Sequence, residues 1–434
     1  MSDYEKQSER RRRLQQTMQA GIAIIPTAHE RMRNRDSDYL FRYDSYFWYL
    51  CGFPEPEAVL VLIAGAEPRS ILFCRDKNVE RELWEGFRFG PEAAREHFGV
   101  DEAHSIGLLD EMLPGLIANQ PALWYAPGAD TAWDTRVLGW LNQVRAQART
   151  GVSAPADIRD VRLALDEMRL FKDDAEITTM RRAATISAAA HVRAMRATRP
   201  GKAEYEIEAE LQYEFRRGGA QYPAYWPIVA GGANACVLHY RENNQPLVDG
   251  ALLLVDAGCE LDGYAADITR TWPVGGKFSG PQRDLYEIVL ESQLAAIAAV
   301  KPARHWNEPH EAAVRILAQG FIDLGLCEGP LDRVIETEDY RRFYMHRTGH
   351  WLGLDVHDVG EYKHANAWRP LQPGMTLTVE PGCYVRPNDK VPEKFWNIGI
   401  RIEDDVLVTE SGCEVLTRET PKAAADIEAL VGSA

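Results

Sequence analysis

The chain has 434 residues, 45% of them hydrophobic, which is enough for two or three domains with full cores. Its net charge of −16 disfavours nucleic acid and anionic membranes as partners, because both bind clustered Lys and Arg. The seven cysteines are scattered without a Cys-x-x-Cys pair, and no apolar run is long enough to cross a bilayer. We therefore expect a cytoplasmic protein that does not contact membranes.

The first third of the chain alternates between helical and β-type patterns. A helix is expected over 8–18, followed by β-type segments at 21–28, 47–53, 58–64, 70–75 and 123–125. This part contains neither a phosphate-binding glycine loop nor a Gly-x-Ser-x-Gly elbow, so an organising or substrate-gating role is expected. The pattern predicts an amino-terminal α/β domain over residues 1–168.

The rest of the chain groups its helices and strands differently. Helices are expected over 157–168, at the domain boundary, and then over 176–198, 204–217, 281–300 and 308–324. The β-type segments lie at 226–230, 252–256, 265–272, 375–380, 398–403 and 405–409. This grouping predicts an α+β fold in which a second domain, 169–434, has a curved, largely antiparallel sheet backed by helices.

The segment 252–274 contains two aspartates in an apolar β-type background. A strand ends at Asp256, a turn is expected at Asp262-Gly263, and a second strand carries Asp267, so the segment is predicted to form a hairpin. A register that placed Asp256 opposite Asp267 would bring their Cβ atoms to about 5 Å. Two carboxylates at about 4 Å repel by roughly 4 kcal/mol at an effective dielectric near 20, so a shared proton or a multivalent cation must offset the repulsion.

Three further segments bring polar groups out of an apolar background. Residues 346–357 contain three histidines, a strand ends on Glu380 before Pro-Gly, and another strand has Arg401 and Glu403 on one face. Each feature alone has an ordinary structural explanation, such as a turn, a hydrogen-bonded histidine or a solvated acidic edge at 403–405. The joint pattern of four carboxylates at strand ends and one histidine in a glycine-flanked segment favours a metal site instead.

Four carboxylates and one imidazole are a donor set that suits two divalent cations. The oxygen-rich set favours Mn²⁺, with Co²⁺ or Zn²⁺ as alternatives, and the lack of thiolate ligands argues against a structural zinc site. Two metals about 3.5–4 Å apart lower the pKa of a shared water and act as a Lewis acid on a carbonyl. The expected chemistry is hydrolysis with water as the nucleophile.

The order and context of these residues resemble the metal-dependent pita-bread peptidases, and within them the aminopeptidase P family of Xaa-Pro aminopeptidases. The resemblance lies in LLLVDAGCE, GYAADITRT, HRTGHWLGLDVHD, LTVEPGCY and GIRIEDD, and extends to SDYLFRYDSYFWYLCGFPEPEAVLVL and DEMRLFKDDAEI. It implies an amino-terminal domain of the creatinase/aminopeptidase P type and a pita-bread catalytic domain. It also implies peptide substrates with proline in second position, two divalent metal ions and a homo-oligomer, either a dimer or a tetramer.

The resemblance assigns roles residue by residue. Asp267 and Glu403 would bridge both metals, Asp256 would complete one metal, and His350 and Glu380 would complete the other. The remaining assignments are catalytic or substrate-binding: His239, His346, His357, Arg401, and less closely matched Tyr225 and Tyr384. Trp84 corresponds to a tryptophan that a neighbouring subunit donates to the cleft. Arg347-Thr348 departs from the small residues expected between His346 and Gly349, which bears on the pocket rim.

The resemblance implies that a metal-bridging hydroxide attacks the carbonyl of the first residue, that Glu380 handles the proton and that His357 stabilises the oxyanion. The nearest alternative is a prolidase of the same fold, which cuts only dipeptides. A methionine aminopeptidase would lack so large an amino-terminal domain, and the metal-free creatinases and non-enzymatic binding modules would lack ligands. A calcium-binding structural protein fits poorly, because the carboxylates are dispersed and no EF-hand loop is present.

Overall fold

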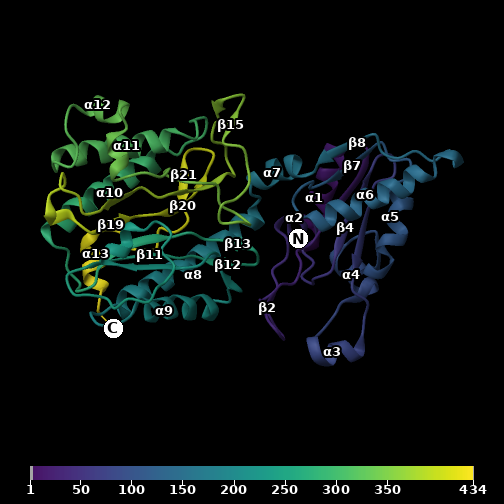
Figure 1. Cartoon of the computed structure of the whole chain (residues 1–434), viewed down its shortest axis with the longest axis horizontal. Helices are drawn as coiled ribbons and strands as arrows, with labels where there is room; N and C mark the ends of the chain where they lie inside the picture. The colour runs from purple at the N-terminus through teal and green to yellow at the C-terminus, as the bar shows by residue number, and fades with distance from the viewer. Residues whose placement is uncertain (1–2, 434) are drawn as a thin grey trace. The chain divides into compact units, whose positions relative to one another are not determined.

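The computed structural model describes residues 3–433 and divides into two compact units, Met1–Met168 and Arg169–Ala434 (Figure 1). The α+β fold class predicted from the sequence is confirmed, with a mixed sheet in the first unit and antiparallel sheets in the second. Among the described residues, no helix is both long enough and apolar enough to cross a bilayer.

The first unit is built on one six-stranded sheet with the strand order β6-β5-β4-β1-β7-β8. The central pairs β1–β4 and β4–β5 are antiparallel, whereas β5–β6, β1–β7 and β7–β8 are parallel. The strands of this unit, including the small β2–β3 hairpin, are β1 Gly21–Pro26, β2 Met32–Asn34, β3 Ser37–Asp38, β4 Val59–Ala64, β5 Arg69–Cys74, β6 Glu102–Ser105, β7 Ala122–Tyr125 and β8 Asp157–Asp160. Strand β4 is buried along its whole length, because helices pack against both faces of the sheet.

One β-type prediction in the first unit is wrong. Residues 47–53 lie mostly in a helix, because the Asp44 side chain accepts hydrogen bonds from the amides of Tyr46 and Phe47 and so begins a helix there. Gly52 ends it with φ 67°. Two of the aromatic residues in this segment, Phe47 and Tyr49, instead lie on the buried face of the helix. The helices are α1 Asp3–Met18, α2 Ser45–Cys51, α3 Val79–Glu85, α4 Gly90–Phe98, α5 Leu109–Ile117 and α6 Thr131–Ala146.

The expected helix over 157–168 is also partly wrong. Residues 157–160 form β8, which pairs in parallel with β7, and the helix α7 begins only at Arg162 and ends at Leu170. The Asp160 side chain accepts a hydrogen bond from the amide of Arg162, which favours a helix start at this point. The edge position of β8 explains why its residues lack the apolar character of a buried strand.

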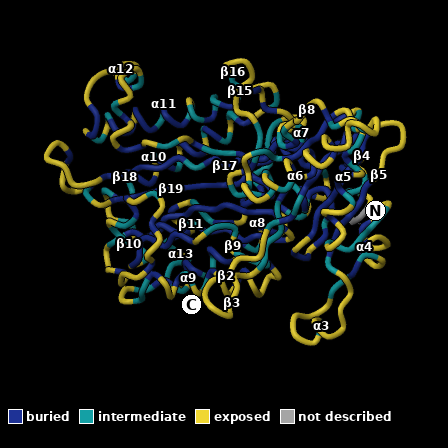
Figure 2. The backbone as a smooth tube through the Cα atoms, turned by 45° about the vertical axis from the view of Figure 1, so that its right-hand side comes forward, coloured by how far each residue is buried: buried dark blue, intermediate teal, exposed yellow. Residues whose placement is uncertain are grey.

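The second unit contains two helix pairs, each followed by antiparallel strands. The pair α8 Asp174–Ala197 and α9 Glu204–Arg217 precedes the sheet β10-β11-β14, and the pair α10 Gly280–Ala299 and α11 Glu308–Asp323 precedes the sheet β17-β20-β21. Figures 1 and 2 show the two helix pairs on opposite sides of β11 and β19, which are buried except for Asp256 at the end of β11. The two short helices are α12 Leu331–Glu336 and α13 Ala424–Leu430.

The expected helices 176–198, 204–217, 281–300 and 308–324 agree with the structure to within two residues at each end. The expected strand 265–272 is interrupted, because residues 266–268 leave the ladder between β13 and β14. The strands are β9 Tyr222–Pro223, β10 Ile228–Gly231, β11 Leu252–Asp256, β12 Cys259–Leu261, β13 Tyr264–Ala265, β14 Thr269–Pro273, β15 Lys363–His364, β16 Ala367–Trp368, β17 Thr376–Val379, β18 Gly382–Val385, β19 Ile398–Arg401, β20 Asp404–Val408 and β21 Cys413–Val415.

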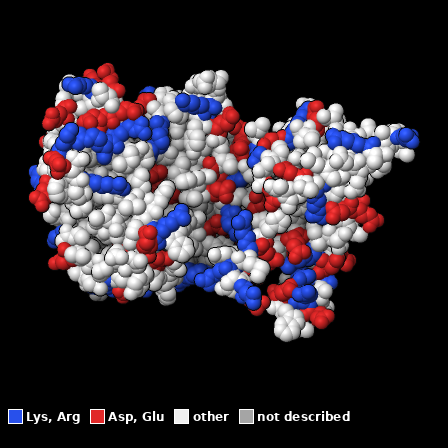
Figure 3. Space-filling model, in the orientation of Figure 1, with Lys and Arg blue, Asp and Glu red and all other residues white. Residues whose placement is uncertain are grey.

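Basic and acidic side chains are interspersed on the face of the molecule that Figure 3 shows.

Candidate active site

The two aspartates of the 252–274 hairpin do not face each other across a ladder. Asp256 at the end of β11 pairs with Thr269, so a register with Asp256 opposite Asp267 is wrong. Residues 257–268 leave this ladder and form the short β12–β13 hairpin, which turns at Asp262-Gly263 as predicted, with both residues at positive φ. The side chains still converge, because the Tyr225 hydroxyl lies 2.6 Å from Asp256 Oδ1 and 2.5 Å from Asp267 Oδ1.

The other three expected ligands come from the second helix-and-sheet half of the unit. His350 Nε2 lies 3.4 Å from Asp267 Oδ2 and 3.7 Å from Glu380 Oε1. One ligand atom each from Asp267, His350 and Glu403 lies within 4.8 Å of the others. All five residues line one cavity of about 430 Å³: Asp256, Asp267, His350, Glu380 and Glu403.

Several groups that orient these ligands were not predicted from the sequence. The Thr269 hydroxyl donates to Glu403 Oε2 at 2.6 Å, and the Thr378 hydroxyl accepts from the amide of His350 at 3.1 Å. The Trp351 carbonyl lies 2.9 Å from His350 Nδ1, which leaves Nε2 free to face the carboxylates. Thr269 and Thr271 lie on the same face of β14. This alternation of polar residues in the sequence was the one signal that could have predicted hydroxyl groups beside the expected ligands.

The electrostatics of the cluster indicate a need for positive charge. Burial, followed by the charges of Asp267 and two other carboxylates, raises the pKa of Glu403 well above its usual range. Burial opposes protonation of His350, but Asp267 and Glu380 outweigh it and raise its pKa to about 9. Both shifts have the same cause, since the buried carboxylates favour a nearby positive charge. Metal cations would supply that charge, and the set of four carboxylates and one imidazole fits two divalent cations.

Arg401 supplies one permanent positive charge beside the cluster. Its Nη2 donates to Asp256 Oδ2 at 2.7 Å, its Nη1 donates to the Tyr384 hydroxyl at 3.0 Å, and its Nε donates to the Thr269 hydroxyl at 3.2 Å. Arg401 is 4% exposed, so these contacts are made away from bulk water. The guanidinium therefore holds Asp256 and Thr269 in fixed positions.

The acidic run 403–405 is not a solvated edge. Asp404 is fully buried and accepts from Arg270 Nη2 at 2.7 Å and Lys422 Nζ at 2.6 Å. Asp405 is 1% exposed and accepts a hydrogen bond from the amide of Asp267 at 3.1 Å. The three neighbouring carboxylates thus face a ligand cluster, an ion-pair network and a backbone amide, respectively.

The structure brings most of the expected substrate-binding residues to the same cavity. Tyr225, His239, His346, His357 and Arg401 all line it, and the His357 ring lies 4.3 Å from the His350 ring. Tyr384 lies behind the lining, where its hydroxyl is 2.9 Å from His346 Nε2. Lining residues to which the sequence analysis assigned no catalytic or binding role are Trp226, Ile228, Leu238, Arg241, Arg347, Gly349 and Val356.

Two residues singled out from the resemblance lie in other settings. Trp84 is 85% exposed on α3 in the first unit. Arg347, the departure at the pocket rim, contacts Asn307 and lies over the Trp368 ring at 5.2 Å, and its neighbour Thr348 is buried against Tyr344 and His310. The rim is therefore built from a tethered arginine and a buried threonine instead of small residues.

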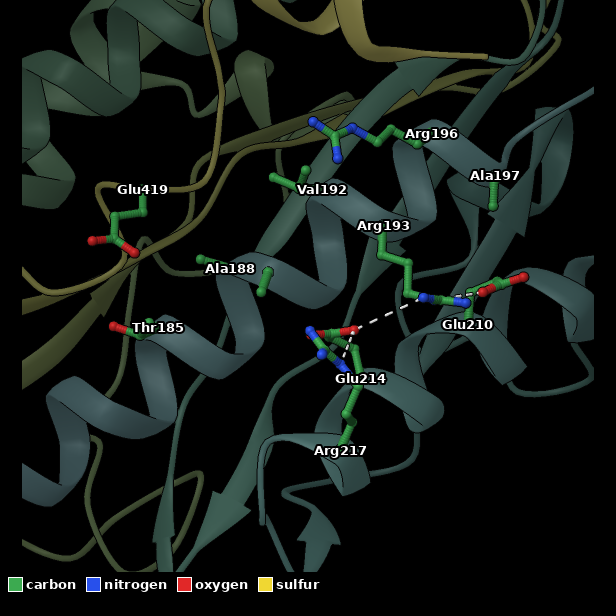
Figure 4. A pocket seen from close by; sticks show the side chains of 11 residues that line it. Thr185, Ala188, Val192, Arg193, Arg196, Ala197, Glu210, Glu214, Arg217 and Glu419 are labelled. Atoms are coloured by element: carbon green, nitrogen blue, oxygen red, sulfur yellow. Dashed lines mark hydrogen bonds and ion pairs between the residues drawn. The ribbon is translucent and has the colours of Figure 1, made fainter. Parts of the chain in front are cut away.

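A second hollow, of about 590 Å³, lies between α8 and α9 (Figure 4). Four of the charged side chains that line it form ion pairs, Arg193–Glu210 at 2.6 Å and Arg217–Glu214 at 2.8 Å. Ala188 and Val192 contribute apolar surface. The described residues that line it include no histidine, so it lacks the donor set that the 430 Å³ cavity has.

Comparison with known proteins agrees with this geometry. Residues 178–410 match the model of metallopeptidase family M24, and residues 7–124 match the aminopeptidase P amino-terminal domain. The chain is 46% identical to an Xaa-Pro aminopeptidase of Haemophilus influenzae, over 98% of this chain and 97% of that protein. Among solved structures it resembles aminopeptidase PepP of Pseudomonas aeruginosa, with a TM-score of 0.98, 51% identity and coverage of 99% and 98% of the two chains.

A zinc-substituted aminopeptidase P of Escherichia coli in complex with product is also similar, with a TM-score of 0.97 and 45% identity over 99% of this chain and 98% of that one. These two structural matches extend over both units of the protein. The chain therefore belongs to the aminopeptidase P group of metallopeptidase family M24.

Proposed function

We propose that this enzyme is an Xaa-Pro aminopeptidase, which releases the first residue from peptides that have proline in second position. The observation that carries the proposal is the convergence of four carboxylates and His350 in one cavity with His239, His346 and His357. The names of the H. influenzae relative and of the aminopeptidase P structures support the same activity.

Five residues would hold two divalent cations, most favourably Mn²⁺, with Co²⁺ or Zn²⁺ as alternatives. Asp267 and Glu403 would contribute to holding both cations, Asp256 would help to hold one of them, and His350 and Glu380 would help to hold the other. When bound, the cations would supply a water of lowered pKa as the nucleophile and a Lewis acid for the scissile carbonyl.

The protein side chains position the peptide and move the proton. The Glu380 carboxylate lies at the cavity wall, where it is placed to accept a proton from the attacking water and pass it to the leaving nitrogen. His357 and His239 lie at the same wall, and an imidazole N–H of His357 aimed at the carbonyl oxygen would stabilise the developing negative charge. Arg401 keeps Asp256 and Thr269 in place during the reaction.

Selectivity for proline must come from shape, because an Xaa-Pro bond has no N–H to recognise. His346 is held by the Tyr384 hydroxyl at 2.9 Å and packs edge-on against the Tyr344 ring at 4.9 Å. Burial lowers the pKa of His346 to about 3, so the ring is neutral and can pack against a pyrrolidine ring. Trp226 adds a further aromatic surface to the cavity.

The test uses the full chain, purified without chelator and analysed for metal. An Xaa-Pro-Yaa tripeptide, an Xaa-Pro dipeptide and an Xaa-Ala-Yaa tripeptide are compared with added Mn²⁺. We expect cleavage of the proline tripeptide with release of Xaa, and at least a hundredfold lower kcat/KM for the alanine tripeptide. Cleavage of the dipeptide alone would identify a prolidase, and equal cleavage of both tripeptides would contradict proline selectivity.

We also propose that the enzyme works in the cytoplasm as a homo-oligomer, a dimer or a tetramer. The assembly is supported by four exposed apolar side chains on and beside α3, namely Val79, Leu83, Trp84 and Phe87. Sedimentation of the wild type and of Trp84→Ala and Leu83→Ala variants tests the assembly. A monomeric wild type would contradict it.

A further inference from the structure

The loop that follows His350 carries His357, and one backbone carbonyl, that of Trp351, contacts both ends of it. The Trp351 carbonyl accepts a hydrogen bond from the amide of Asp358 at 2.9 Å, and His350 Nδ1 lies 2.9 Å from the same oxygen. The orientation of the His350 ring and the path of the loop at His357 therefore depend on the same peptide group.

Two basic side chains from the start of the second unit, Arg169 and Lys172, bind this loop through the Asp358 carboxylate. Arg169 Nη2 donates to Asp358 Oδ1 at 2.6 Å, and Lys172 Nζ donates to Asp358 Oδ2 at 2.9 Å. All three side chains are only 1% exposed. Arg169 Nη2 also reaches Asp355 Oδ2 at 2.7 Å, but that side chain is 40% exposed, so water screens the contact.

The packing around this carboxylate leaves little freedom. A Cβ on Gly353 would lie 2.1 Å from Asp358 Oδ2, so the loop wraps closely around the carboxylate. The Gly353 carbonyl also accepts from the amide of Ala265, two residues before Asp267. The Lys172 amide donates to the Gly374 carbonyl, and this hydrogen bond fixes the backbone of Lys172 next to the segment that leads into β17. Two ion pairs and close packing restrict the buried Asp358 carboxylate to a single conformation. The backbone on either side of Asp358 is restricted in the same way.

We infer that Arg169, Lys172 and Asp358 are positioning residues for the reaction, which act through the Trp351 carbonyl and the loop backbone on His350 and His357. This inference rests on the proposed function and deepens it. None of the three side chains lines the cavity, so any effect they have on turnover must pass through neighbouring groups, and the Trp351 carbonyl and the loop backbone connect them to the two histidines. The paired charges hold the loop in the geometry in which His350 faces the carboxylates and His357 faces the substrate.

The test compares Asp358→Asn and Lys172→Met with the wild type, each loaded with Mn²⁺. We expect kcat to fall about 10–100-fold, the usual effect of removing a group that orients a metal-binding histidine, with KM within about threefold of wild type. The Co²⁺-loaded proteins give a readout independent of turnover, and we expect the visible absorption bands to shift in both variants. The double variant should lose less than the sum of the two, because Asp358→Asn alone leaves the buried Lys172 ammonium without its carboxylate partner, and Lys172→Met removes that charge.

Two matched controls separate positioning from simple loss of stability. Asp355→Asn removes the exposed partner of the same Arg169, and we expect kcat within twofold of wild type and unchanged Co²⁺ bands. Leu317→Ala truncates a fully buried side chain of α11, and we expect a lower Tm with kcat unchanged at a temperature where the variant is folded.

Wild-type kcat and Co²⁺ bands in folded Asp358→Asn and Lys172→Met would overturn the inference. It would also be overturned if Leu317→Ala, at a similar loss of Tm, lowered kcat as much as they do. A wild-type enzyme that binds Co²⁺ without cleaving Xaa-Pro peptides would instead refute the proposed function, and the Co²⁺ bands of the variants would still decide the positioning role.

Discussion

Arg401 Nη2 donates to Asp256 Oδ2 at 2.7 Å, and this contact ties an expected metal ligand to the strand that leads to another, Glu403. The guanidinium also contacts the Thr269 hydroxyl, whose own proton is directed at Glu403 Oε2. A single buried side chain thus orients ligands from both halves of the second unit.

Replacing Arg401 by Lys is expected to lower kcat/KM about 10–100-fold, because an ammonium cannot contact Asp256, Thr269 and Tyr384 at once. Steady-state kinetics at saturating Mn²⁺ measure the effect. Arg386→Lys is the matched control, since Arg386 donates to the Cys236 carbonyl and does not line the cavity. Equal activity of R401K and wild type would refute the role given to the guanidinium.

Thr269→Val removes the hydrogen bond to Glu403 Oε2 at nearly constant shape, and we expect metal affinity to weaken about tenfold. Titration of the apo-enzyme with Mn²⁺ measures the Kd. Thr376→Val provides the comparison, because the Thr376 hydroxyl is buried and has no hydrogen-bond partner among residues 3–433, so that its loss should leave Kd unchanged. Unchanged Kd in Thr269→Val would show that Glu403 needs no such donor.

His357→Ala should lower kcat by about 10²–10³ and leave the metal content unchanged, because the ring lines the cavity without belonging to the expected ligand set. Rate measurements are paired with metal analysis of the same sample. His364→Ala, at an exposed histidine on β15, should behave like wild type. A loss of metal in His357→Ala would contradict the assigned role.

Removal of metal should abolish peptide cleavage and lower Tm, because cations that bind only the folded protein stabilise it by mass action. Dialysis against chelator followed by Mn²⁺ titration tests both effects, with activity and Tm recovering together. Full activity in thoroughly demetallated enzyme would contradict the proposed chemistry.

His191 predicts a specific pH dependence of stability. Burial lowers the pKa of this fully buried ring to about 4, and Nε2 lies 2.9 Å from the Ala257 carbonyl. Because the unfolded chain binds the proton more tightly, with a pKa near 6.5, the free energy of unfolding should fall as the pH drops from about 6.5 to 4, by up to about 3 kcal/mol.

The wild type and His191→Gln are compared by denaturant unfolding across this pH range. The other titrating groups contribute alike to both proteins, so the difference isolates the imidazole. We expect a shallower fall in the variant. Parallel curves would show that the ring does not stay neutral in the folded state.

Local signals in the sequence predicted most elements of the second unit correctly, and they singled out five residues that the structure brings to one cavity. Helix 204–217 and strand 252–256 have the predicted bounds, because helix-ending glycines and a run of apolar residues mark them locally. Asp256 and Glu380 were identifiable because each follows an apolar strand and a carboxylate there is unusual. The aromatic run 47–53 led to a wrong strand prediction, because its strand-like composition did not reveal that Asp44 begins a helix.

The sequence by itself determined which side chains are present for chemistry: four carboxylates, an imidazole and the histidines around them, in an order typical of one peptidase family. Only the tertiary structure decided how they are arranged. It placed Asp256 opposite Thr269 instead of Asp267, divided the acidic run 403–405 among three environments, and brought Arg169 and Lys172 to Asp358 across more than 180 residues. Such relationships depend on registers and packing between segments far apart in the chain, which no local pattern of residues encodes.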